Sequence, residues 1–94
     1  MAETTVADNP ARHRYEVSVD GVIAGVAVYR RDGPTVTFVH TEVDVEFEGQ
    51  GIGGALARGA LDDVRAQGGR VVAECPFIKA WIASHPSYQD LVTP

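Results

Sequence analysis

The sequence predicts one α+β domain, with a mostly antiparallel sheet, a single βαβ crossover and C-terminal helices. Three observations support this fold class. Alternating apolar runs joined by tight-turn signals fill the first half of the chain. A glycine-rich loop follows them and leads into an amphipathic helical pattern. A short apolar run and two short helical segments then complete the chain.

The first residues carry no strong periodic pattern. Residues 1–11 are therefore expected to form a disordered N-terminal tail, and residues 12–94 the domain itself. The opening "MAETTVADNPARHR" also lacks the basic and apolar regions of a secretory signal. We expect a soluble cytoplasmic protein.

Two hairpins are predicted next. Apolar and polar residues alternate over residues 15–19, as is typical of a half-buried strand. Asp20-Gly21 is a turn signal, and residues 22–31 resume as a second strand. "RDGP", residues 31–34, predicts another turn before the third strand.

The third strand is predicted to be long, and it leads into the crossover. Residues 35–47 are rich in β-branched side chains, and their number favours a bulge, placed near residues 42–44. Apolar residues at helical spacing predict a helix over residues 52–67, which Gly68-Gly69 ends. Residues 70–75 are predicted to form a short strand, parallel to the strand before the helix.

Two helical segments are predicted after that strand. Residues 77–84 form the first, with Phe77, Trp81 and Ile82 as its inward face, and residues 87–92 form a last turn or two.

Composition excludes several classes of function. The net charge of −5 is the opposite of what a nucleic-acid-binding protein needs. No apolar run is long enough to cross a membrane. The single cysteine, Cys75, forms no internal disulfide, which suits a reducing compartment. The three histidines show no metal-ligand spacing, and we expect no metal site.

The glycine loop, "EFEGQGIGGALA", raises the main functional question. Gly49, Gly51 and Gly54 match the dinucleotide fingerprint G-x-G-x-x-G, and Glu74 lies where that fingerprint places an acid. The context argues against a Rossmann fold, because an antiparallel meander precedes the loop and too little chain follows it. A P-loop is excluded because no G-K-[ST] follows.

Two interpretations of the loop are left. The glycines could serve only a tight entry into the helix. The better interpretation is a phosphate cradle, since backbone free of side chains lets successive N–H groups face one anion in front of the helix dipole.

The loop and its surroundings resemble a known family. Residues 48–53, Glu-Gly-Gln-Gly-Ile-Gly, occupy the pattern [Q/R]-x-x-G-x-[G/A] of the GCN5-related N-acetyltransferases (GNAT). "HTEV", "GQGIG", the Cys75 strand end and "HPSYQDLV" together are similar to the minimal, yjdJ-like members of that superfamily, over nearly the whole chain.

The resemblance implies acetyl-CoA as the cofactor. In such folds pantetheine lies between the strand before the loop and the strand after the helix, which places Thr41 to Val43 beside the thioester. Val43 would pair with pantetheine like an added strand. The implied cofactor-binding residues are Thr41, Val43, Gly49, Gln50, Gly51, Ile52, Gly53 and Gly54.

One residue departs from the family pattern. Glu48 stands where Gln or Arg is preferred, so that position supplies no cation to the pyrophosphate. Backbone amides are then expected to hold the phosphates, with Arg58 or Arg70 as candidates to reach one of them.

The candidate catalytic residues are His40, Glu42 and Cys75. Acetyl transfer needs a neutral amine, and either His40 or Glu42 could be the general base. The resemblance also implies that a main-chain N–H within Thr41 to Val43 polarises the acetyl carbonyl. Cys75 could accept the acetyl group or only line the pocket. Each of these residues could equally be an ordinary structural one.

The sequence therefore predicts an acetyl-CoA-dependent N-acetyltransferase acting on an exposed amine, on a protein or a small polyamine. No helices stand between the first two predicted strands to form an acceptor wall, so the acceptor site would be open or completed by another chain. A monomer and a homodimer are both compatible. The alternatives are a non-catalytic CoA or acyl-CoA binding module and a small interaction domain with structural glycines.

Overall fold

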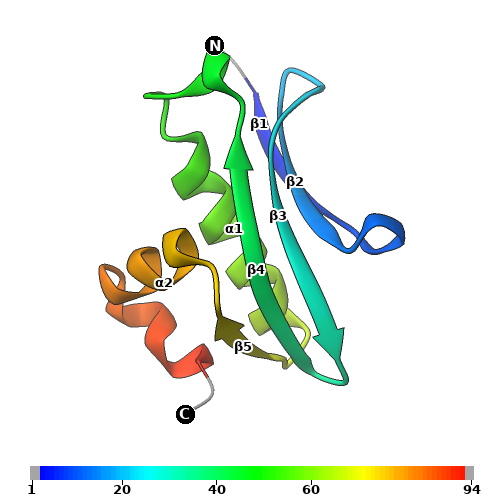
Figure 1. The fold of residues 1–94 in the computed structure, drawn as a ribbon, viewed down its shortest axis with the longest axis vertical. Helices are drawn as coiled ribbons and strands as arrows, with labels where there is room; N and C mark the ends of the chain where they lie inside the picture. The colour runs from blue at the N-terminus through cyan, green and yellow to red at the C-terminus, as the bar shows by residue number, and fades with distance from the viewer. Residues whose placement is uncertain (1–2, 93–94) are drawn as a thin grey trace.

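The computed structural model describes residues 3–92 as a five-stranded sheet with a long helix across one face (Figure 1). The strands lie in sequence order, and all neighbours are antiparallel except β4 and β5, which are parallel. Their bounds are β1 Thr4–Asn9, β2 Arg14–Val19, β3 Val22–Asp32, β4 Thr35–Val43 and β5 Arg70–Ala73. The predicted fold class, with its single βαβ crossover, is confirmed.

Strand β1 corrects the prediction of a disordered tail. Residues 4–9 pair in full register with β2, and a 3₁₀ turn, η1 (Pro10–Arg12), joins the two strands. Asp8 of β1 also accepts a 2.6 Å hydrogen bond from the Tyr29 hydroxyl. The tail prediction is therefore wrong from Thr4 onward, and residues 1–2 lie outside the described range.

The hairpin predictions are confirmed in detail. Asp20 and Gly21 connect β2 to β3 with positive φ values of 50° and 83°, the left-handed pair that a two-residue hairpin turn needs. Gly33, with a φ of 59°, makes the next turn between β3 and β4.

Strand β4 is shorter than predicted and bulged elsewhere. It ends at Val43, and Asp44 instead accepts the Glu46 N–H to start a 3₁₀ turn, η2 (Val45–Phe47). The bulge falls at Val39, because Val28 pairs with His40 whereas Tyr29 pairs with Phe38. Val39 lies between Phe38 and His40, and no local sequence signal marks a bulge there.

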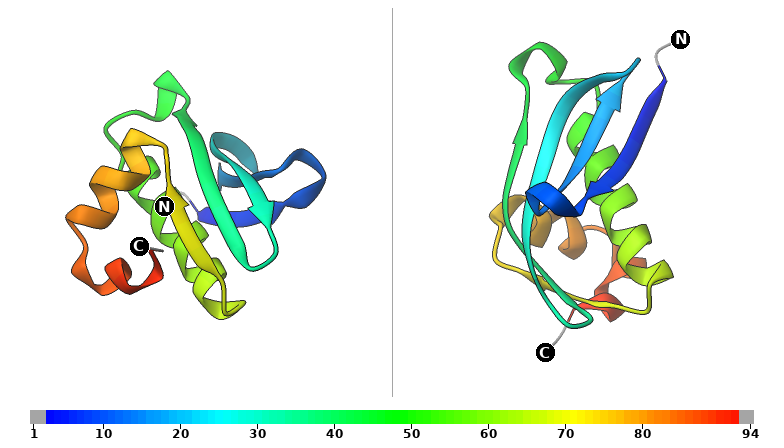
Figure 2. Two further views of the ribbon diagram at one scale, coloured as in Figure 1. Left: turned by 60° about the horizontal axis from the view of Figure 1, so that its bottom comes forward. Right: turned by 90° about the vertical axis from the view of Figure 1, so that its right-hand side faces the viewer.

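Helix α1 (Ile52–Ala66) supplies the largest part of the core on its side of the sheet. Figure 2 shows it along one face, while the other face of β2 and β3 carries no helix from residues 3–92. The hydroxyl of buried Tyr15 donates a 2.6 Å hydrogen bond to Asp63 of α1, and burial with this carboxylate raises the Tyr15 pKa. The inward-facing residues of α1 are Ile52, Leu56, Ala57, Ala60, Leu61 and Val64.

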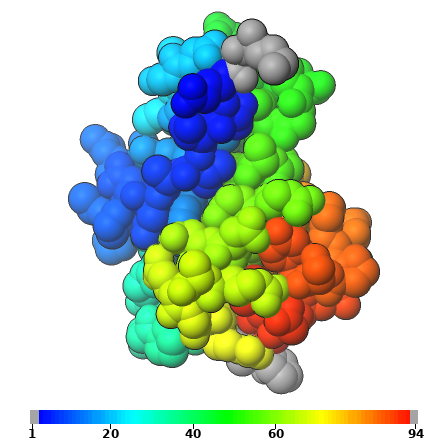
Figure 3. Space-filling model, turned by 180° about the vertical axis from the view of Figure 1, so that it is seen from behind, coloured from blue at the N-terminus to red at the C-terminus, as the bar shows by residue number. Residues whose placement is uncertain are grey.

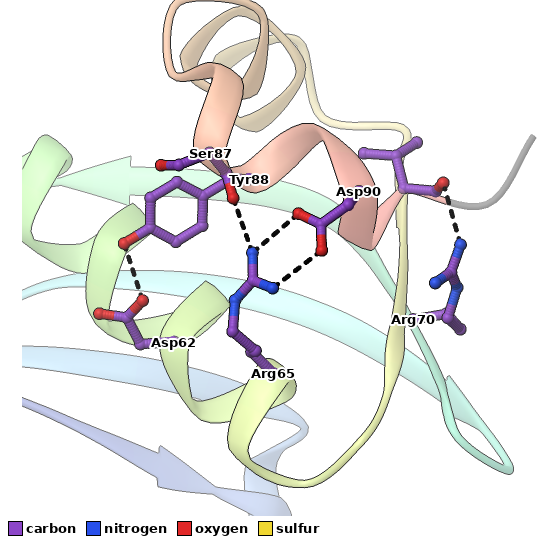
Figure 4. Close-up of polar contacts among 7 residues, drawn as sticks. Asp62, Arg65, Arg70, Ser87, Tyr88 and Asp90 are labelled. Atoms are coloured by element: carbon purple, nitrogen blue, oxygen red, sulfur yellow. Dashed lines mark hydrogen bonds and ion pairs between the residues drawn. The ribbon is translucent and has the colours of Figure 1, made fainter.

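The C-terminal segment packs beside α1 as helix α2 (Pro76–Ala83) and the 3₁₀ helix η3 (Pro86–Leu91). Figure 3 shows this segment against α1 when the molecule is seen from behind. Arg65 of α1 bonds both carboxylate oxygens of Asp90 at 2.9 Å and the Ser87 carbonyl at 2.7 Å (Figure 4). The Arg65 guanidinium lowers the Asp90 pKa.

The inward face of α2 differs from the prediction. Ile82 is buried and Trp81 packs partly buried against the core, as predicted, but Ile78 is buried in place of Phe77. Phe77 is exposed and lies over the glycine loop. Pro76 occupies the first turn of the helix, where its missing N–H costs no hydrogen bond. Within the described residues, no helix is long and apolar enough to cross a membrane.

Candidate functional site

Strands β4 and β5 separate halfway along β4. β5 pairs with β4 only over Thr35–Phe38. The Phe38 carbonyl then accepts both the Glu74 N–H, at 3.0 Å, and the Cys75 N–H, at 2.9 Å, which ends the ladder. In Figure 1, β4 runs on well past the end of β5. Residues 39–43 of β4 therefore have an edge without a strand partner in the described structure.

The Val39 bulge decides which side chains face this opening. A one-residue insertion exchanges the two faces of a strand. Thr41 consequently points inward, where its Oγ1 lies 3.3 Å from Sγ of buried Cys75. His40 and Glu42 are exposed, and their Nε2 and Oε1 atoms lie 3.3 Å apart.

The three predicted catalytic residues thus fall into two groups. Cys75 is beside Thr41 within the opening, and His40 and Glu42 form a pair on the outer face of β4. His40 and Glu42 are two residues apart in β4 and therefore share a face of the strand.

The glycine loop has the backbone geometry of an anion cradle. Gly49 and Gly51 have φ values of 83° and 73°, and a Cβ at either position would meet open space. No side chain caps the N-terminus of α1. The first N–H groups of a helix have no partner within the helix, so they are available to an anion here.

A hollow of about 270 Å³ lies in front of this loop. Gln50 does not line it and instead donates to the Glu46 carbonyl at 3.4 Å. The hollow is continuous with the open edge of β4. Gly53, in the loop, lies next to Val43, at the end of that edge, since a Cβ on Gly53 would be 3.6 Å from Cγ2 of Val43. The lining residues are Val43, Phe47, Glu48, Gly49, Gly51, Ile52, Gly53, Gly54 and Phe77.

Phe77 is a site residue that the sequence interpretation misplaced. A Cβ at Gly53 would lie 2.9 Å from Cζ of Phe77, so glycine lets the aromatic ring close over the loop. No pattern in the sequence signalled this position, because it depends on how the start of α2 meets the glycine loop.

Charges near the hollow are sparse. Glu48, the residue that departs from the family pattern, lines this hollow and places a carboxylate beside it. Arg70 opens β5 opposite Thr35, at the far end of the β4–β5 pairing, and bonds the Val92 carbonyl at 3.4 Å. Arg58 is nearer to the loop, one helical turn beyond Gly54.

A second hollow, of about 510 Å³, lies where β3 pairs with the end of β4. Its lining includes the carboxylates Glu42 and Asp44 and the apolar side chains Ile23 and Val26. Arg14 also borders it but is paired with Glu16 at 2.8 Å. The hollow therefore combines two carboxylates with an apolar wall, a lining suited to a cation with a hydrocarbon stem.

The acid that suggested a dinucleotide site has another role. Glu74 forms an exposed ion pair with Arg30 at 3.0 Å. Within residues 3–92, no group of three metal-ligating side chains lies close together.

Comparisons with known proteins identify the family. A family model described as "GCN5-related N-acetyl-transferase" matches residues 14–91. No curated protein matches the chain. Among solved structures, a GCN5-like protein from Staphylococcus aureus is similar, at 23% identity and a TM-score of 0.72, over 99% of this chain and 91% of its own.

The ribosomal-protein-S18-alanine N-acetyltransferase from Escherichia coli is also similar in fold. It is 16% identical, with a TM-score of 0.62, over 78% of this chain and 66% of its own. The finer likeness to yjdJ-like proteins stays a prediction. Because the family match spans most of the chain, the protein belongs to the GCN5-related N-acetyltransferases.

Proposed function

We propose that this protein transfers an acetyl group from acetyl-CoA to an exposed amine. One observation carries the proposal: an unpaired strand edge and a loop suited to an anion follow each other directly in the chain. The unpaired edge of β4, residues 39–43, leads directly into a glycine loop whose first helical N–H groups are uncapped. The edge suits the amide-bearing pantetheine arm as an added strand, and the loop suits the pyrophosphate.

The residues present fit this donor. Gly49 and Gly51 leave the loop backbone uncovered, and the hollow in front of it is walled by Val43, Phe47 and Phe77. Acetyl-CoA supplies an activated acetyl thioester. The N–H groups along residues 41–43 are the proposed donors that stabilise negative charge on the acetyl oxygen.

The proposed proton acceptor is the His40–Glu42 pair. An amine attacks only when neutral, and the imidazole of a histidine is a suitable group to take up the proton that the amine loses. Glu42 lies 3.3 Å from the His40 ring, so the two side chains can act on the same proton. Glu42 also lines the second hollow, so the pair borders the surface where we place the amine.

We propose that Cys75 lines the site and does not react with the acetyl group. Its side chain is 3% exposed, and its sulfur lies 3.3 Å from the Thr41 hydroxyl. Among the described residues no Lys, Arg or His forms a contact with it that would favour a thiolate. Direct transfer to the amine therefore fits the geometry better than a covalent acetyl-enzyme.

The open acceptor surface favours an amine presented by a protein or by a small polyamine. We also propose a cytoplasmic location, and either a monomer or a homodimer as the working form.

The proposal predicts release of CoA that depends on both acetyl-CoA and an amine. Purified protein would be incubated with acetyl-CoA and alkyl amines, polyamines or lysine peptides, and free thiol would be measured. Turnover should appear with the wild type, survive in Cys75→Ala and fall at least about tenfold in Glu42→Gln.

Two results would revise this account. An intact-mass gain of one acetyl group that Cys75→Ala abolishes would establish the covalent route. Binding of acetyl-CoA without thiol release for any amine would favour the non-catalytic module, the alternative that Glu48 at the rim of the hollow supports.

A further inference from the structure

Arg58 is an exposed cation placed one helical turn beyond the glycine loop. It follows Gly54 by four residues in α1, so the two positions share a face and lie about 6 Å apart along the axis. Side chains on a helix lean toward its N-terminus. The Arg58 guanidinium lies over Trp81 and Tyr88, and Gly54 places no side chain between it and the loop.

Two aromatic side chains fix the Arg58 guanidinium in place. Its Cζ lies 5.5 Å from the ring centre of Trp81 and 5.8 Å from that of Tyr88, and Nη1 donates to the Tyr88 hydroxyl at 3.3 Å. Trp81 also reaches back toward the loop, because its Nε1 would lie 3.6 Å from a Cβ at Gly54. A guanidinium held in this way loses little entropy when it binds a ligand.

The charge of Arg58 is not neutralised by an ion pair within residues 3–92. The nearby carboxylate of Asp62 instead accepts the Tyr88 hydroxyl at 2.7 Å. Only one of the five guanidinium N–H donors is used in the described structure, which leaves the others for an anion. By contrast, four arginines are paired with carboxylates: Arg14, Arg30, Arg31 and Arg65.

We propose that Arg58 binds the 3′-phosphate of CoA and makes the protein selective for donors that carry this group. The inference rests on the proposed function, since it takes the pyrophosphate to lie at the loop amides. The 3′-phosphate is joined to the pyrophosphate through a single ribose. A cation one turn from the loop is therefore within reach of it, and an arginine–phosphate contact is a strong one.

The test compares two probes by isothermal titration calorimetry, CoA and 3′-dephospho-CoA. The wild type should bind CoA about tenfold more tightly, as expected for one charge-assisted contact at an exposed site. Arg58→Gln should weaken CoA binding about tenfold, leave 3′-dephospho-CoA binding unchanged, and so abolish the preference.

The matched control is Lys79→Gln. Lys79 is an exposed cation on α2 that lies beside Val72 and Ala73, away from Trp81, so its removal changes net charge equally. This variant should keep the tenfold preference. Equal binding of both probes by the wild type, or an equal loss of both in Arg58→Gln, would overturn the inference alone. Failure of the wild type to bind either probe would overturn the proposed function as well.

Discussion

Replacing Gly51 with alanine should weaken acetyl-CoA binding by about tenfold. Gly51 caps α1 with a φ of 73°, a conformation that costs other residues about 1–2 kcal/mol. Without bound acetyl-CoA, the alanine at position 51 can relax to a negative φ. This change turns the N–H groups of the loop away from the position of the anion. Binding must then restore the strained geometry, and about 1.4 kcal/mol corresponds to tenfold in Kd. Calorimetric titration with acetyl-CoA measures the change.

Gly68→Ala is the matched control for this prediction. Gly68 ends α1 with a φ of 72°, and a Cβ there would also meet open space. The two substitutions therefore impose similar strain at opposite ends of one helix. Gly68→Ala should lower the midpoint of thermal unfolding without changing the Kd of acetyl-CoA. Equal Kd values for the two variants would contradict a role of the loop backbone in binding.

Replacing Gly59 with alanine should destabilise the fold by about 2 kcal/mol. A Cβ at Gly59 would lie 2.6 Å from Cβ of Val6, so helix and strand β1 must move apart. For a domain of this size, the loss corresponds to a fall of about 8–16 °C in the unfolding midpoint. Chemical denaturation gives the free energy of unfolding directly.

The same substitution in a Val6→Gly background separates the clash from any other effect. Without the Val6 side chain, alanine at position 59 should be neutral or stabilising by up to about 1 kcal/mol, because alanine is the better helix former. The sign of the effect would thus reverse between the two backgrounds. Stabilisation by Gly59→Ala in the wild type would instead mean that β1 does not pack on α1.

Strand β1 shows where prediction from sequence fails. The hairpin turns and α1 were predictable because each is encoded by adjacent residues: Asp20-Gly21 for one turn, and a regular apolar stripe for the helix. β1 is an edge strand whose residues are exposed or half-buried, with Val6 directed at α1. Its docking depends on a glycine more than fifty residues away in the chain, and no local pattern records that contact.

The candidate site divides in the same way. The glycine spacing and the strand–loop–helix order located the loop, since both are local. The bulge at Val39, the contact between Thr41 and Cys75, and the position of Phe77 over Gly53 each depend on how separate elements meet. Arg58 could be named as a candidate from sequence, but its contacts with Trp81 and Tyr88 needed the fold.

The most direct test of the account is an amide-resolved NMR titration of the ¹⁵N-labelled protein with acetyl-CoA. The account predicts saturable shifts concentrated at residues 39–43 of β4 and 49–54 of the loop, with small changes in β1 and in the β2–β3 turn. An absence of shifts at millimolar acetyl-CoA would contradict it. Shifts confined to residues outside the β4 edge and the glycine loop would contradict it equally.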